Sequence, residues 1–189
     1  MHRIVVTGPN GAGKTTFARR LAADRPDLPL IHFDALKLTT AWKQRDRAEI
    51  EARLGAVVET PGWILEGGPS LLPRAMPQAD ALVWLDPPLL VRALRLARRP
   101  WGGLGRTRPE LPDGNPDRLW QQYRFAWRSL RHNARFRAEV AEYAAAAGQT
   151  RVWRCRSLAE TNAAHSALDG GRPYAAEPPT VSPPISSVG

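Results

Sequence analysis

The sequence is poor in cysteine and has no long apolar run, and each shortage excludes a class of protein. The single cysteine, Cys155, cannot form an internal disulfide or a cysteine-rich zinc site. No apolar stretch approaches the roughly 18 residues of a membrane-spanning helix. The short run Ile4-Val5-Val6 is no signal-peptide core. We therefore expect a cytoplasmic protein that has no membrane partner.

Histidine and lysine are also scarce. The histidines do not fall at metal-ligand spacing, so a histidine-based metal centre is not expected; they are His2, His32, His132 and His165. Each of the three lysines, at positions 14, 37 and 43, is followed two positions later by Thr or Arg instead of Asp. The N-K-x-D motif with which GTPases read guanine is therefore absent.

Charge is distributed unevenly along the 189 residues. The chain has 27 basic and 18 acidic residues and a net charge of +9. Residues 92–137 hold twelve arginines and three acidic residues, so this segment alone accounts for the net charge. A local basic patch favours an anionic partner, either the phosphates of a small molecule or a nucleic acid.

Strand and helix patterns alternate along the chain. Strands are expected near 3–7, 29–33, 62–66, 80–85 and 150–154. Helices are expected near 13–24 and 46–58, from after Pro87-Pro88 to about 99, from Asn115 to 147 as one long helix, and near 157–164. This alternation predicts an α/β protein with a parallel sheet covered on both faces.

The last part of the chain differs in composition. Residues 167–189 contain five prolines together with Gly and Ser and few large apolar groups. This composition is typical of disordered segments. We therefore expect one folded domain over 1–164 and a disordered tail over 165–189.

The strongest motif is GPNGAGKT at 8–15, which follows a predicted strand and opens a predicted helix. It matches the phosphate-binding pattern G-x-x-x-x-G-K-[ST] (Walker A) in the context that this pattern requires. Glycines let the backbone amides turn toward phosphate oxygens, and the helix N-terminus adds partial positive charge. The predicted nucleotide-binding residues are Gly8, Pro9, Asn10, Gly11, Ala12, Gly13, Lys14, Thr15 and Thr16.

Within this motif, Lys14 is expected to reach the β- and γ-phosphates of ATP and Thr15 to bind Mg²⁺. Without the guanine-reading motif, and with too short a chain for most motor ATPases, a small kinase is the leading class. ATP and Mg²⁺ are the expected cofactors, and a small-molecule acceptor is the expected second substrate. Oligomeric state is left open.

The sequence resembles the adenylate kinase-related P-loop kinases, and within them the DNA topology modulation (FlaR-like) proteins. The matching stretches are GPNGAGKT, IHFD, ILEGG, VWLDPP and GRTRPEL, which fall within about 1–135. The resemblance implies a three-layer P-loop NTPase fold with a five-stranded parallel sheet of order 2-3-1-4-5. It also implies an acceptor region near 34–60 and an Arg-rich lid near 99–116.

Three acidic residues follow predicted strands, at the rim where open α/β sheets bind ligands. Asp34 is a candidate to orient an acceptor hydroxyl or accept its proton, and the alternative is a turn or helix cap. Glu66 is a candidate to hold Mg²⁺ through water, as the resemblance implies. Asp86 precedes two prolines and is predicted to cap a helix, with Mg²⁺ contact as the alternative.

Arginines recur at helical spacing in two places. Residues 92, 95 and 99 share one face, and so do residues 124, 128, 131 and 135 beside a predicted packing stripe of Tyr123, Trp127, Leu130 and Ala134. Such guanidinium groups could stabilise a transferred phosphoryl group, and a solvated basic surface is the alternative. By resemblance, the favoured catalytic arginines are Arg95, Arg99, Arg108, Arg124 and Arg128.

Three hypotheses remain at this stage. The leading one is a Mg²⁺-dependent small-molecule kinase whose acceptor is a nucleotide, a nucleoside or another metabolite. The second is a nucleic-acid-binding regulatory ATPase that uses the basic segment. The third is a nucleotide-binding interaction module that performs no turnover.

Overall fold

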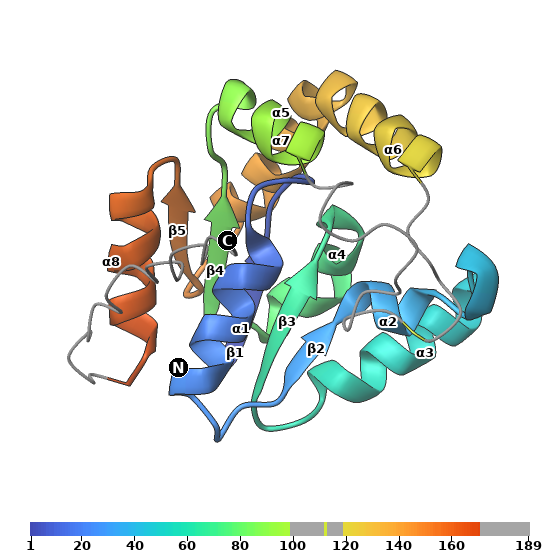
Figure 1. Cartoon of the computed structure of the whole chain (residues 1–189). Helices are drawn as coiled ribbons and strands as arrows, with labels where there is room; N and C mark the ends of the chain where they lie inside the picture. Colours follow the sequence, from blue (N-terminus) through green and yellow to red (C-terminus); the bar gives the residue numbers. More distant parts are fainter. Residues whose placement is uncertain (99–111, 113–118, 171–189) are drawn as a thin grey trace, which may run out of the picture.

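A five-stranded parallel sheet forms the centre of the computed structural model (Figure 1), which describes residues 1–98, 112 and 119–170. The strands are β1 (Arg3–Thr7), β2 (Leu30–His32), β3 (Trp63–Gly67), β4 (Ala81–Leu85) and β5 (Arg151–Cys155). Their order is β2-β3-β1-β4-β5, and every neighbouring pair is parallel. The predicted strand order is therefore confirmed.

Helices cover both faces of this sheet. They are α1 (Lys14–Asp24), α2 (Phe33–Lys37), α3 (Arg47–Val58), α4 (Leu72–Ala75), α5 (Leu89–Arg98), α6 (Leu119–Arg131), α7 (Asn133–Ala145) and α8 (Leu158–Leu168). Short 3₁₀ turns lie at Thr40–Trp42, Pro69–Leu71 and Met76–Gln78. None of the helices in the described part of the chain is long and apolar enough to span a bilayer.

Successive side chains of the strands point to opposite faces of the sheet and pack into two separate apolar cores. On one face, Ile4 and Val6 pack with residues of α1 and α8. On the other face, Val5 and Leu65 pack with residues of α3, α4 and α7. Because both faces are covered, β1, β3 and β4 are buried along nearly their whole length, which accounts for the continuous apolar runs at 4–6 and 81–85.

The predicted long helix from Asn115 to 147 is not continuous. The long helix is interrupted at His132, so α6 and α7 are separate helices. At the junction, the Arg128 carbonyl oxygen accepts the His132 N–H at 3.0 Å and also lies 2.8 Å from the His132 ring nitrogen Nδ1. The predicted start of the long helix, at 115–116, lies outside the described residues.

Helix α8 extends beyond the predicted domain boundary at residue 164. Its last turn is part of the core, since His165, Leu168 and Asp169 are each less than 5% exposed. Composition did not show this because the turn contributes one large apolar residue. Residues 171–189 lie outside the described chain, so the disordered tail stays a prediction there.

Parallel strands bring their carboxyl ends to one edge of the sheet. The loop after β1 rises at this edge toward α5 in Figure 1. The ends of β2, β3 and β4 carry Asp34, Glu66 and Asp86 to the same edge. The fold therefore places every predicted strand-end acid near the loop at 8–15.

Candidate active site

The loop between β1 and α1 depends on glycine at specific positions. Gly11 and Gly13 have φ angles of 79° and 100°, which L-residues rarely adopt. A Cβ atom on Gly8 would lie 2.4 Å from the Leu85 carbonyl oxygen, because the loop passes directly over the end of β4. The Ala12 N–H donates to the Pro9 carbonyl at 3.0 Å and closes the turn.

Helix α1 begins directly from this loop. Its N-cap is Gly13, which has no side chain to cap the N–H groups of the first turn. The helix dipole and the backbone amides therefore face the loop. This is the geometry that binds phosphate at helix N-termini.

A cavity of about 380 Å³ lies over this loop and contains most of the predicted site. It is lined by Asn10, Gly11, Gly13, Lys14, Thr15, Thr16, Arg19, His32, Asp34, Glu66 and Arg95. The structure thus brings the acids after β2 and β3 and one predicted arginine together with the loop. The sequence analysis did not select Arg19 or His32.

Glu66 is the best-connected acid of this cavity. Its Oε1 lies 4.0 Å from Lys14 Nζ, and its Oε2 lies 2.9 Å from His32 Nδ1. Burial alone would raise the pKa of Glu66, but the hydrogen bonds from His32 and Thr15 and the charge of Lys14 outweigh it. The pKa therefore lies below its ordinary value, and Glu66 is a carboxylate at neutral pH.

These residues fit a magnesium ion that is held mainly by phosphate and water. Thr15 and Glu66 line the same cavity, and their hydroxyl and carboxylate groups offer the oxygen ligands that Mg²⁺ prefers. Among the described residues, no cluster of three or more acidic, His or Cys side chains could hold a metal ion without a substrate. Thr15 and Glu66 would hold Mg²⁺ together with a bound nucleotide.

Asp34 lies in the first turn of α2, where the N-cap position belongs to His32. The helix-cap alternative for Asp34 is therefore wrong. Its side chain is exposed and lines the same cavity as Lys14 and Glu66. An exposed carboxylate beside the phosphate site can accept a hydrogen bond or a proton from an acceptor.

Helix α5 supplies two arginines that bind the loop. Arg95 Nη1 donates to the carbonyl oxygens of Gly11 at 3.4 Å and Ala12 at 3.2 Å. Arg92, which the sequence analysis placed on the same face but did not select, donates from Nε to the Asn10 carbonyl at 3.0 Å. Arg99 and Arg108 lie outside the described residues.

The predicted arginines of α6 lie elsewhere. Arg124 and Arg128 are exposed and are not among the described residues that line the phosphate-loop cavity. The predicted packing stripe on this helix is also wrong, since Trp127 is 66% exposed. Gln122 and Ala126 are buried instead, so α6 is rotated relative to the prediction.

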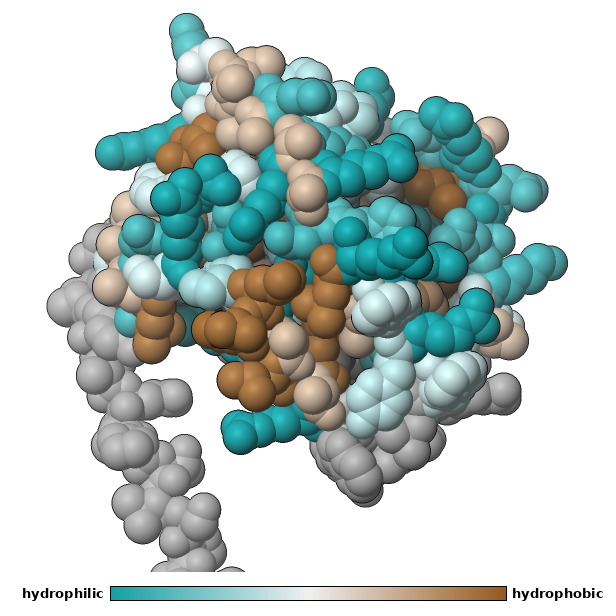
Figure 2. Space-filling model, turned by 90° about the horizontal axis from the view of Figure 1, so that it is seen from above, coloured by the Kyte–Doolittle hydropathy of each residue, from teal (hydrophilic) through white to brown (hydrophobic). Residues whose placement is uncertain are grey.

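The surface over α5 and α6 is therefore both apolar and basic. Figure 2 looks down on this end and shows apolar groups surrounded by hydrophilic ones. Leu90, Leu94, Trp120 and Trp127 are each more than 60% exposed. Neither helix has an acidic residue in its first turn, and both have arginines in their last turn.

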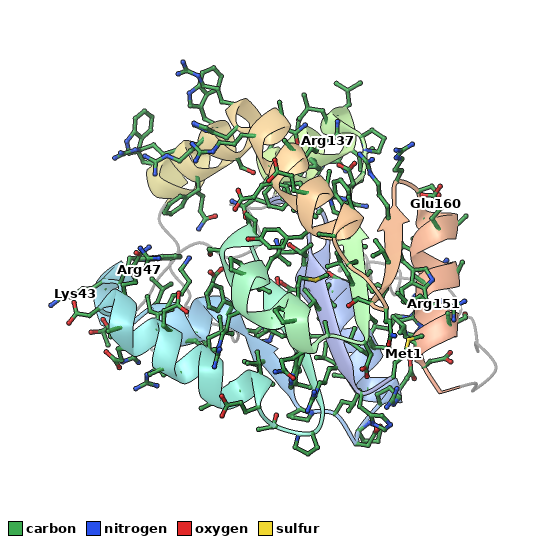
Figure 3. All side chains as sticks on the ribbon, turned by 180° about the vertical axis from the view of Figure 1, so that it is seen from behind. Met1, Lys43, Arg47, Arg137, Arg151 and Glu160 are labelled. Atoms are coloured by element: carbon green, nitrogen blue, oxygen red, sulfur yellow. The ribbon has the colours of Figure 1, made fainter. Side chains whose placement is uncertain are left out.

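Asp86 has a structural role that differs from the predicted helix cap. Its carboxylate is buried and accepts hydrogen bonds from Arg137 Nε at 2.7 Å and from Arg154 Nη2 at 2.7 Å. Figure 3 shows Arg137 at the end of the molecule where α5 to α7 gather. Because both oxygens are occupied, Asp86 joins β4 to α7 and β5, and the structure gives it no place as a metal ligand.

A second cavity, of about 710 Å³, adjoins the first. The two share Gly13, Thr16 and Arg95. Apolar groups from α1, β4 and α8 line the second cavity, among them Phe17, Leu85 and Leu158. An apolar cavity continuous with a phosphate site has the character of a pocket for a flat base.

Another cavity, of about 870 Å³, lies at the opposite edge of the sheet. Met1, Arg3 and Arg151 line it, at the amino ends of the strands. Figure 3 shows Met1 and Arg151 at this end, far from Arg137. Ligands of open α/β sheets bind at the carboxyl ends of the strands. Because this cavity lies at the amino ends, it is not the candidate active site.

His32 could have been found from the sequence only with the sheet pairing known. In the parallel register, His32 is opposite Glu66 on the neighbouring strand. Two residues paired in this way have their side chains on the same face of the sheet. Nothing in the sequence alone indicates that these residues, more than thirty positions apart, are paired.

A parallel sheet of order 2-3-1-4-5, with helices on both faces and a glycine-rich phosphate loop after its central strand, is the three-layer P-loop NTPase fold. No protein-family model matches the chain. No curated protein has a detectably similar sequence either.

Several kinases are among the solved structures that are similar to this chain. The shikimate kinase of Bacteroides thetaiotaomicron is 18% identical with a TM-score of 0.46, covering 88% of this chain and 95% of its own. The shikimate kinase of Acinetobacter baumannii is 16% identical with a TM-score of 0.46, covering 89% and 91%. A gluconokinase from Sinorhizobium meliloti 1021 is 19% identical with a TM-score of 0.39, covering 71% and 94%.

Proposed function

We propose that the protein is a small-molecule kinase that transfers the γ-phosphoryl group of ATP to a hydroxyl-bearing acceptor. One observation carries this proposal: a single cavity holds the phosphate loop, Lys14, the Thr15–Glu66 pair and the exposed Asp34. A site that only bound nucleotide would not need an exposed carboxylate beside the terminal phosphates.

The nucleotide occupies both adjoining cavities. The loop amides and Lys14 bind the β- and γ-phosphates. The base enters the apolar cavity between α1 and α8, which shares Gly13 and Thr16 with the phosphate site. Mg²⁺, held by Thr15 and by Glu66 through water, neutralises charge on the phosphates when the nucleotide is bound.

Asp34 acts on the acceptor. A bond forms between the acceptor oxygen and the γ-phosphorus while the bond from that phosphorus to the β–γ bridging oxygen breaks, and ADP leaves. The hydroxyl proton passes to the Asp34 carboxylate. Arg95 lines the cavity, and Arg99 and Arg108 are the further arginines proposed to contact the transferred phosphoryl group.

The test separates binding from transfer. Lys14→Ala is expected to lower ATP affinity and turnover together, because it removes a phosphate contact. Asp34→Asn is expected to leave the ATP dissociation constant within about twofold and to lower turnover about 10²–10⁴-fold. Binding is measured by calorimetry, and turnover by ADP release with a panel of nucleosides, nucleotides, sugars and hydroxy acids.

Glu142→Gln, an exposed charge change on α7, is the matched control and should change neither quantity. ATP binding without acceptor-dependent ADP release across the panel would favour a binding module over a kinase. Unchanged turnover in Asp34→Asn, with an acceptor that the natural chain phosphorylates, would contradict the role of Asp34.

A second candidate function, binding of nucleic acid, is favoured by one surface feature. Trp120, Arg124, Trp127 and Arg131 recur at i, i+4, i+7 and i+11, and all four are exposed. Alternating aromatic and guanidinium groups suit the stacking and phosphate contacts of single-stranded nucleic acid. Micromolar, steeply salt-dependent binding of a labelled oligonucleotide, lost in Trp120→Ala/Trp127→Ala, would support this function; no binding near 0.1 M salt would exclude it.

A further inference from the structure

Helix α5 packs with an arginine inside and leucines outside. Arg92 is fully buried, whereas Leu90 is 78% exposed and Leu94 is 62% exposed. Removing a guanidinium group from water costs several kcal/mol unless its donors are well bonded. The helix buries Arg92 and exposes the neighbouring leucines, so the guanidinium group must have specific hydrogen-bond acceptors.

The partners of Arg92 come from three separate elements. Nε donates to the Asn10 carbonyl of the phosphate loop at 3.0 Å, and Nη2 donates to Ser129 Oγ of α6 at 3.0 Å. Nη1 donates to Asn133 Oδ1 at the start of α7. One planar guanidinium group thus joins the phosphate loop to both helices above it.

These three acceptors are all uncharged. Burial lowers the pKa of Arg92, the nearby charge of Arg137 lowers it further, and Asp86 partly offsets both. The local charge is positive, since Arg92 and the two arginines bound to Asp86 outnumber that carboxylate. The arrangement therefore favours an anion in the adjacent loop.

The loop is packed closely against α5 at this point. A Cβ atom on Gly11 would lie 2.9 Å from Leu96 Cγ and 3.2 Å from the Arg92 carbonyl oxygen. In a trans peptide, the carbonyl of Asn10 and the N–H of Gly11 point in opposite directions. Binding of the carbonyl by Arg92 therefore directs the Gly11 N–H away from the guanidinium group.

We propose that Arg92 is a positioning residue that holds the phosphate loop in its anion-binding conformation and ties that conformation to the packing of α6 and α7. Arg92 acts through the backbone and does not touch the nucleotide. The inference rests on the proposed binding of ATP phosphates at this loop. It goes beyond the proposed function because it makes the affinity for nucleotide depend on how α6 packs, although the described residues of α6 do not line the phosphate-loop cavity.

The experiment measures ATP affinity in Arg92→Met, which keeps the length of the side chain and removes its donors. We expect ATP to bind about 10- to 100-fold more weakly, the effect of losing a charge-assisted hydrogen bond. Arg98→Met, at an exposed position on the same helix, is the matched control and should bind ATP as the natural chain does.

Chemical rescue distinguishes positioning from a general loss of stability. In Arg92→Ala, low and non-denaturing concentrations of guanidinium chloride should restore ATP affinity, whereas equal NaCl should not. A merely structural residue would lower the melting temperature and leave the affinity of the folded protein unchanged, without rescue. That result would overturn the proposal.

Two further outcomes are also decisive. If Arg92→Met does not fold, Arg92→Lys replaces it, since lysine keeps the charge but carries its donors on one nitrogen, without the planar fork that reaches three separate acceptors. Natural ATP affinity in Arg92→Lys would then contradict the positioning role. Failure of the natural chain to bind ATP at all would instead contradict the proposed function, so the two failures are distinguishable.

Discussion

At the scale of single residues, the site depends on close approach as much as on charged groups. Gly8 lies against the Leu85 carbonyl, and Gly11 lies against Leu96. Lys14 and His32 both contact Glu66 and keep it ionised. The chemistry of the cavity therefore depends on which side chains are absent as well as on which are present.

We expect Gly8→Ala to destabilise the protein by about 2–3 kcal/mol and to abolish ATP binding. The added methyl group would overlap the Leu85 carbonyl at 2.4 Å, and backbone must shift to make room. Urea denaturation and calorimetric titration with ATP measure the two effects.

The matched control is Gly68→Ala, because a Cβ atom there meets nothing within 4 Å. Its φ angle of −84° is ordinary for alanine. Gly68→Ala should therefore have natural stability and natural ATP affinity. A Gly8→Ala protein as stable as this control would show that the loop does not pass over β4 as described.

At the scale of elements, the helix ends that differ from the sequence prediction are those set by contacts with other elements and not by local sequence signals. The break between α6 and α7 coincides with the region where Arg92 bonds Ser129 and Asn133. Helix α8 begins as predicted, at a capping box formed by Ser157 and Glu160. Its end was missed because its last turn is stabilised by packing and not by a local signal.

We expect a chain that stops at Ala164 to be less stable by about 2 kcal/mol or more, with a melting temperature about 4–8 °C lower. The truncation removes the buried Leu168 side chain and the hydrogen bond from Arg25 Nη1 to the Leu168 carbonyl. Calorimetric melting measures the change.

A chain that stops at Gly170 is the control, since it keeps the whole of α8. The composition of 171–189 predicts that this chain melts at the natural temperature. Equal melting of the two truncated chains would contradict the role of the last turn of α8.

At the scale of the whole molecule, stability should depend on pH through a buried histidine. Burial lowers the pKa of His165, as does the charge of Arg20, while Asp24 and Asp169 oppose them less strongly. The unfolded state therefore binds the proton more readily than the folded state. Stability is then present above the unfolded pKa of about 6.5 and is lost as the pH falls below it.

We expect the free energy of unfolding to fall on going from pH 7.5 to 5.5, by up to about 1.4 kcal/mol per pH unit from this group. His165→Leu should flatten the dependence, whereas His2→Gln, at an exposed position, should leave it unchanged. Denaturation curves at several pH values measure the slope. A slope in His165→Leu equal to that of the natural chain would assign the effect to other groups.

The sequence by itself determined the alternation of strands and helices and the phosphate loop, while the strand order was implied by the family resemblance. Strand and helix periodicity are local, and the G-x-x-x-x-G-K-T spacing contains its own turn and helix start, so neither requires distant contacts. Parallel topology then fixed the edge at which Asp34 and Glu66 lie.

Only the tertiary structure decided which charged side chains meet. Asp86 binds Arg137 and Arg154, Glu66 binds His32, and Arg92 binds the phosphate loop, although these partners are more than thirty residues apart. Helical spacing showed that arginines share a face, but it could not show which face is buried. That choice is made by packing between elements, where the bonding of one buried guanidinium outweighs the exposure of leucines on the other side of the helix.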